Sequence, residues 1–131
     1  MIDLLSDNDV ELYVELIRTV FTDHEWNEFG VQGISTLREC GLDPKSSDRA
    51  IWLYCQAHAM LLVTGNRNEK GHDSLGRVIG ELNLPEHLPV LTIAMPGRVS
   101  QMNYREDCAY RIADIAMALD RVRGSGRLFI P

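Results

Sequence analysis

Two hydrophobic patterns alternate along the chain and predict different secondary structures. Continuous apolar runs are typical of strands covered on both faces of a sheet, and they occupy residues 1–6, 60–64 and 88–94. Residues 29–36 contain two glycines and predict a weaker strand, and residues 127–130 predict a closing strand. Apolar residues at helical spacing predict helices from residue 10 onward, over residues 46–59, from residue 73 onward and over residues 103–122.

Polar residues mark the starts of these predicted helices. Asn8 is followed three residues later by Glu11, a spacing at which each side chain can satisfy a free backbone N–H of the first turn. Asp48 begins the helix over residues 46–59, and Asp73 is expected to cap the next one. Residues 21–29 are polar with aromatic interruptions and predict either a helix end or a loop.

Strands and helices therefore take turns through the whole chain. This alternation predicts an α/β fold, a three-layer sandwich in which helices cover both faces of a mainly parallel central sheet. The 131 residues contain no internal repeat and no linker, so we expect a single domain over residues 1–131.

Charge is unevenly distributed along the chain, whose net charge is −6. Residues 1–65 contain 4 basic and 11 acidic side chains, whereas residues 66–131 contain 9 basic and 8 acidic ones. This balance argues against a protein that coats DNA without specificity, which would need a broad basic face. An acidic half leaves room for a local cluster of carboxylates that holds a cation, although a solvated acidic surface explains it equally well.

Cysteine usage and the chain start indicate the compartment. The three cysteines form no CxxC pair, which argues against structural zinc and fits a reducing environment. The first residues lack the basic segment of a secretory signal, so we expect a cytoplasmic protein. No apolar run approaches the about 20 residues of a membrane span, and we expect no membrane partner.

Oxygen-bearing side chains follow the predicted strands where a parallel sheet binds ligands. Asp7 and Asp9 follow the first strand, Asn66 and Asn68 follow the strand over residues 60–64, and Asp48 starts the preceding helix. Carboxylate and amide oxygens suit Mg²⁺ or Mn²⁺, which can activate water and neutralise a phosphodiester. Taken singly, these residues are also ordinary helix-start and turn residues.

Three segments resemble the short PIN-like proteins, a branch of the PIN nuclease superfamily that includes toxin-like members. They are residues 4–10 (LLSDNDV), residues 41–52 (GLDPKSSDRAIW) and residues 61–68 (LLVTGNRN). In that family the first strand ends in an Asp, a GL…SD..I stretch leads into the central helix, and a VVT.D.DF-like stretch ends the next strand. The resemblance covers residues 1–80 and implies a PIN-like fold, an RNA substrate and a nuclease that depends on Mg²⁺ or Mn²⁺.

The resemblance also assigns roles to individual acids. Asp7 corresponds to the first metal-binding acid, and Asp48 corresponds to the acid at the start of the central helix. Asp9 is a further candidate metal ligand near the first strand. The family pattern does not assign Asp73, but its position at a later helix start leads us to expect that it joins Asp7 and Asp48 in the catalytic set.

The chain departs from the family pattern after the strand over residues 60–64. Asn66 and Asn68 stand where the family usually has Asp, so the site loses up to two negative charges. Metal affinity and water activation are both expected to fall. We predict that Asn66 and Asn68, together with Arg67 between them, contact the substrate.

Three functions remain open at this point. The first is a metal-dependent ribonuclease with weakened activity. The second is a catalytically inactive PIN-like module for interaction or dimerisation, and the resemblance suggests an antitoxin-like protein or a second copy of the chain as its partner. The third is a phosphoacceptor receiver domain, which is disfavoured because Gly65 and Asn66, not a phosphorylatable Asp, follow the strand over residues 60–64.

Overall fold

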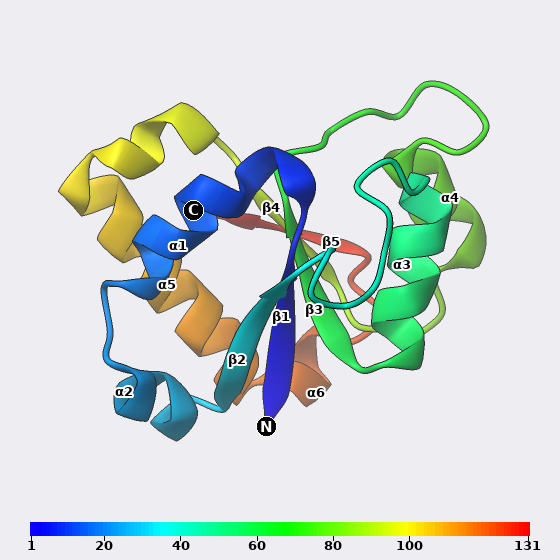
Figure 1. The fold of residues 1–131 in the computed structure, drawn as a ribbon. Helices are drawn as coiled ribbons and strands as arrows, with labels where there is room; N and C mark the ends of the chain where they lie inside the picture. The colour runs from blue at the N-terminus through cyan, green and yellow to red at the C-terminus, as the bar shows by residue number, and fades with distance from the viewer.

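Five strands form one all-parallel sheet in the computed structural model, which describes residues 1–131 (Figure 1). Their order across the sheet is β2-β1-β3-β4-β5. The strands are β1 (Ile2–Ser6), β2 (Val31–Thr36), β3 (Met60–Thr64), β4 (Val90–Ile93) and β5 (Arg127–Ile130). The predicted parallel sheet, its weaker strand and its closing strand are all confirmed.

Helices cover both faces of this sheet and complete three layers (Figure 1). One face carries α1 (Glu11–Arg18), α2 (Asp23–Glu28), α5 (Met102–Met117) and α6 (Leu119–Val122). The other face carries α3 (Asp48–Ala57) and α4 (Leu75–Leu82). Two 3-10 turns, η1 (Asn8–Val10) and η2 (Pro96–Ser100), follow β1 and β4. No helix combines the length and the apolar character that crossing a bilayer requires.

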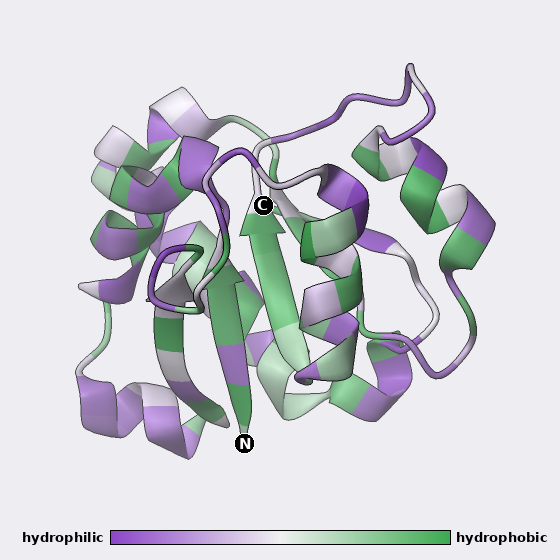
Figure 2. Cartoon of the chain, turned by 45° about the vertical axis from the view of Figure 1, so that its right-hand side comes forward, coloured by the Kyte–Doolittle hydropathy of each residue, from purple (hydrophilic) through white to green (hydrophobic).

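Each face of the sheet has its own hydrophobic core. Successive residues of a strand point to opposite faces, so Leu4 lies in the core beneath α1 and α5 while Leu5 lies in the core beneath α3 and α4. Leu61 and Leu62 of β3 divide in the same way. Burial on both faces explains the continuous apolar runs of the sequence, and Figure 2 shows mainly apolar strands between helices that mix hydrophobic and hydrophilic residues.

Two of the predicted helix caps are wrong. The capping box of Asn8 and Glu11 does not form, because residues 8–10 make a 3-10 turn that Asp7 caps through its side chain. Helix α4 is capped by Ser74, whose hydroxyl accepts a hydrogen bond from the N–H of Arg77, and not by Asp73.

The helices around the larger core also differ from the prediction. Residues 23–28 form α2, and Thr22 and Glu25 build a capping box at its start. The predicted helix over residues 103–122 breaks at Ala118, whose backbone leaves the helical region. This break turns Leu119 and Val122 against the larger core.

The strand order places a switch point between β1 and β3. The chain steps from β1 to β2 on one side and then crosses to β3 on the other side. In doubly wound sheets of this order, the crossovers leave in opposite directions and open a crevice at the carboxyl ends of the two strands. Asp7 follows β1, and Asn66 lies two residues after β3.

We predict that Leu61→Ala lowers the free energy of unfolding by about 2–5 kcal/mol, because it leaves a cavity in the central strand. Leu61 is 0% exposed. Urea denaturation followed by circular dichroism measures the change. Leu53→Ala is the matched control, because Leu53 on α3 is 48% exposed, and it should cost less than about 1 kcal/mol. Equal losses in the two variants would contradict the proposed core.

Candidate functional site

Asp7 is fixed between the two central strands. Its backbone N–H donates to the carbonyl of Val63 on β3 at 2.9 Å. Its Oδ1 accepts from the N–H of Asn8 at 2.8 Å, and its Oδ2 accepts from the Thr64 hydroxyl at 2.7 Å. Thr64 is completely buried, so this hydroxyl has a defined direction and holds the carboxylate in one orientation.

The same threonine extends the connection to Asp48. The Thr64 hydroxyl oxygen accepts from the N–H of Asn66 at 3.0 Å, and Asn66 Nδ2 donates to Asp48 Oδ2 at 3.0 Å. Asp48 is the first residue of α3, where Ser47 caps the helix by accepting from the N–H of Ala50. A chain of hydrogen bonds therefore runs from Asp7 through Thr64 and Asn66 to Asp48.

An open depression of about 440 Å³ lies over this chain of hydrogen bonds. Its charged lining residues are all acidic, namely Asp7, Asp9 and Asp48. Asn66 lines it too, and the remainder is Asn8, Pro44, Ser46 and Ile51. The structure thus brings together four of the predicted site residues from segments far apart in the sequence. We call this depression the acidic pocket.

Asp9 reaches the acidic pocket from η1. It accepts a hydrogen bond from the backbone of Gly65, directly after β3. A Cβ on residue 65 would come within 3.1 Å of Asp9 Oδ2, and glycine allows this close approach. Gly65 therefore lets the end of β3 and the Asp9 carboxylate lie side by side.

Burial and neighbouring negative charge disfavour the ionised forms of Asp9 and Asp48. Burial raises the pKa of Asp48 above its ordinary value, the negative charge of Asp7 adds to the rise, and the hydrogen bond from Asn66 opposes it. Burial also raises the pKa of Asp9, with further contributions from the charges of Asp7 and Asp48. The acidic pocket is therefore a place where a cation would relieve an unfavourable concentration of negative charge.

Arg127 supports the pocket from behind and was not predicted as a site residue. Its Nη1 donates to the carbonyl of Asn66 at 2.8 Å and also to the Thr92 hydroxyl at the end of β4. Desolvation lowers the pKa of this half-buried guanidinium, while the charge of Asp48 acts in the opposite direction. One indication of this role is present in the sequence. The predicted closing strand over residues 127–130 begins with Arg127 and so places a basic residue within the sheet.

Three predicted site residues lie outside the acidic pocket. Asp73 pairs with Arg49 at 3.0 Å, and this ion pair ties the long loop after β3 to α3. Arg67 donates to the carbonyl of Ala94 and lies over the ring of Phe129. Asn68 shapes the loop, as its N–H donates to Asn66 Oδ1 at 2.8 Å. The long hydrophilic loop that carries them is visible in Figure 2.

The donor chemistry of the acidic pocket fits a hard divalent cation. No three His, Cys, Asp or Glu side chains lie in an arrangement that could hold a metal ion. Mg²⁺, however, usually keeps several waters and is bound through only one or two carboxylates together with substrate phosphates. Asp7 and Asp48 are two such carboxylates, and Asp9 lies on the same rim.

Comparisons of the chain with protein-family models, with curated proteins and with solved structures found no match. The resemblance to short PIN-like proteins therefore stays a prediction from the sequence.

We predict that Asp48→Asn raises the free energy of unfolding at pH 7 by up to about 1 kcal/mol, after allowance for solvent screening. The fold raises the pKa of Asp48 above its ordinary value of 3.8, so ionisation of this carboxyl lowers the stability of the folded state. This loss of stability grows as pH rises from 3.8 through the raised pKa. The amide retains an oxygen that accepts from Asn66. Urea denaturation at pH 7 and at about pH 3 measures the gain, which should disappear at the lower pH.

Asp114→Asn is the control, because Asp114 is an exposed acid on α5. It removes the same charge and should change stability by less than about 0.5 kcal/mol. A loss of stability in Asp48→Asn at pH 7 would contradict the repulsion described for the acidic pocket.

Proposed function

We propose that this protein is a metal-dependent phosphodiesterase acting on RNA, with the acidic pocket as its active site. The observation that carries the proposal is the chain of hydrogen bonds that aligns Asp7 and Asp48 at the switch point of the sheet. Ligand sites of doubly wound sheets lie at this point. The sequence resemblance to PIN-like nucleases agrees with the same two acids.

The residues of the acidic pocket would have separate roles in binding the cation and in orienting its ligands. Asp7 and Asp48 hold the cation, and Asp9 adds negative charge at the rim. Bound Mg²⁺ or Mn²⁺ supplies positive charge that stabilises the phosphodiester transition state and makes water more acidic. Thr64 orients Asp7, and Asn66 orients Asp48, so both carboxylates are in place before the substrate arrives.

Asn66 makes the proposed activity weak. It contributes a neutral amide where an acid would add a third negative charge, and its Nδ2 already donates to Asp48. Cation affinity depends on the number of charged ligands, so an Asn at this position lowers it. We expect slow turnover that requires millimolar Mg²⁺ or Mn²⁺.

A second candidate function is a catalytically inactive interaction module. The specific observation in its favour is again the contact between Asn66 and Asp48, because it satisfies the carboxylate without any cation. In this case the hydrogen bonds of the pocket serve only to join β1, β3 and α3.

We predict that the protein cleaves a fluorogenic single-stranded RNA in the presence of Mn²⁺ and that Asp7→Asn reduces the rate about 100-fold or more, because it removes one of two charged ligands. The double variant Asn66→Asp with Asn68→Asp loses the hydrogen bond to Asp48. It should nevertheless raise the rate about tenfold or more, because a bound cation gains charged ligands and offsets the added repulsion. Thermal denaturation confirms that each variant folds. Asp107→Asn, an exposed acid on α5, is the control and should match the wild type.

Two other outcomes are informative. No cleavage by the wild type together with a gain in the double variant would identify an inherited site that has lost its reaction. No cleavage by either protein would contradict the proposed phosphodiesterase and favour the interaction module.

A further inference from the structure

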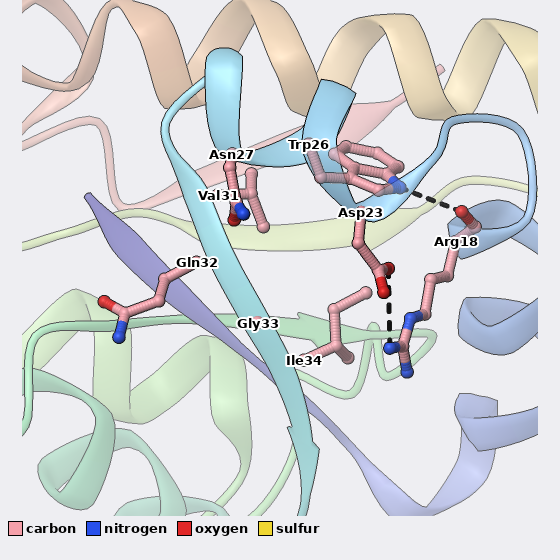
Figure 3. A pocket seen from close by; sticks show the side chains of 8 residues that line it. All are labelled: Arg18, Asp23, Trp26, Asn27, Val31, Gln32, Gly33 and Ile34. Atoms are coloured by element: carbon pink, nitrogen blue, oxygen red, sulfur yellow. Dashed lines mark hydrogen bonds and ion pairs between the residues drawn. The ribbon is translucent and has the colours of Figure 1, made fainter.

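A second concave region runs along the outer side of β2, and it shares no lining residue with the acidic pocket. Two neighbouring cavities of about 250 and 240 Å³ open there, the first below α2 and the second beside α1. Both are lined by Arg18 and Ile34, so they form one groove between the helices and the strand. We call this region the β2 groove, and Figure 3 shows its α2 end.

The floor and walls of the β2 groove combine apolar and polar groups. Trp26 and Val31 are buried at one end, where Trp26 Nε1 donates to the carbonyl of Arg18 at 2.8 Å. Leu12 at the other end is 81% exposed, although it lies next to this groove. Ile34 is half-buried in the middle, and Figure 3 shows it beside Asp23 on one side of β2.

The strand itself is an unprotected edge. Strand β2 has β1 as its only neighbour in the sheet, so the backbone groups on its outer side have no strand partner. Its sequence, VQGIST, contains neither the Lys nor the Pro that proteins commonly place on edge strands to prevent pairing. Gly33 in its centre carries no side chain that would obstruct an approaching backbone.

Charge around the β2 groove is strongly negative. Four acids and a single base are its charged lining residues: Glu11, Glu15, Asp23, Glu39 and Arg18. The single base is already engaged, because Arg18 lies 3.4 Å from Glu15 and 3.6 Å from Asp23. A further acid, Asp3 of β1, lies next to Gly33, since a Cβ at that position would be 3.5 Å from Asp3 Oδ1.

We propose that the β2 groove binds an extended, Lys- or Arg-rich peptide segment of another protein, which adds to the sheet as a sixth strand. Backbone pairing with the part of β2 before Thr36 gives affinity, because an edge strand offers a row of free donors and acceptors. The N–H of Thr36 already donates to Glu39. Every second side chain of such a strand points to the face that carries α1 and α2. At these positions apolar residues can reach Ile34 and Leu12, and basic residues can meet the acids.

The charge distribution disfavours a second copy of this chain as the occupant. Pairing β2 with β2 would bring the acids of two identical grooves together, and like charges across an interface cost several kcal/mol. A basic segment is instead attracted by each of these acids. This proposal is independent of the acidic pocket, which lies at the carboxyl ends of β1 and β3.

Fluorescence anisotropy with a synthetic probe tests the proposal. The probe is a labelled peptide of about nine residues, long enough to cover the six residues of β2. Lys and Val take turns at every second position with Thr between them, so one face of the strand presents both basic and apolar side chains. We predict micromolar binding to the wild-type protein. A second probe carries N-methyl groups at alternate residues, which removes backbone donors on one side of the strand, and it should bind about tenfold more weakly or worse.

Charge reversal in the protein provides the matched comparison. Glu11→Lys with Glu15→Lys should weaken binding of the first probe about tenfold or more, because both acids line the groove. Asp107→Lys with Asp114→Lys introduces the same charge change on the exposed face of α5 and should leave the affinity within about twofold. Circular dichroism establishes that both double variants fold.

Three results would overturn the proposal. The first is no binding of the basic probe at about 1 mM. The second is equal binding of the two probes, which shows attraction by charge without strand pairing. The third is a wild-type dimer in analytical ultracentrifugation that dissociates in the Glu11→Lys, Glu15→Lys variant, which assigns the groove to a second copy.

Discussion

The hydrogen bond from Thr64 to Asp7 is the contact on which the candidate site depends. It joins the ends of two adjacent parallel strands at the point where the crossovers of the sheet diverge. Because Thr64 is buried and also accepts from the N–H of Asn66, the orientation of Asp7 and the path of the chain after β3 are set together. Without this hydroxyl, Asp7 and Asp48 would be two acids on separate elements with no common support.

The acidic pocket works against the stability of the fold. The pKa values of Asp9 and Asp48 are raised by burial and by neighbouring negative charge, so the folded chain holds these carboxylates in an unfavourable environment. Functional sites commonly keep such groups where a purely structural surface would not. Arg127 compensates in part, since its positive charge acts to lower the pKa of Asp48. The β2 groove holds a second concentration of acids. There the free edge of the sheet favours an extended basic peptide as the partner, and not a cation.

Much of the fold was predictable because burial on two faces leaves a clear pattern. The strand over residues 60–64 was predicted with its observed bounds, and Asp7 and Asp48 were expected at one sheet edge. Other features depend on contacts between distant residues. Asp is a common residue at the N-cap of a helix, and Asp73 was therefore expected to cap α4. Ser74 caps this helix, and Asp73 pairs with Arg49. The strand order, and with it the role of Arg127, depends on packing between distant segments, which the local sequence pattern does not predict.

A crystal structure grown with millimolar Mn²⁺ would show whether Asp7 and Asp48 share one cation, because anomalous scattering locates the ion without reference to activity. The account predicts one peak within about 2.2 Å of oxygens from both Asp7 and Asp48, with waters completing the coordination shell. A peak bound to only one of these acids, or no peak in the acidic pocket at that concentration, would contradict a shared cation site.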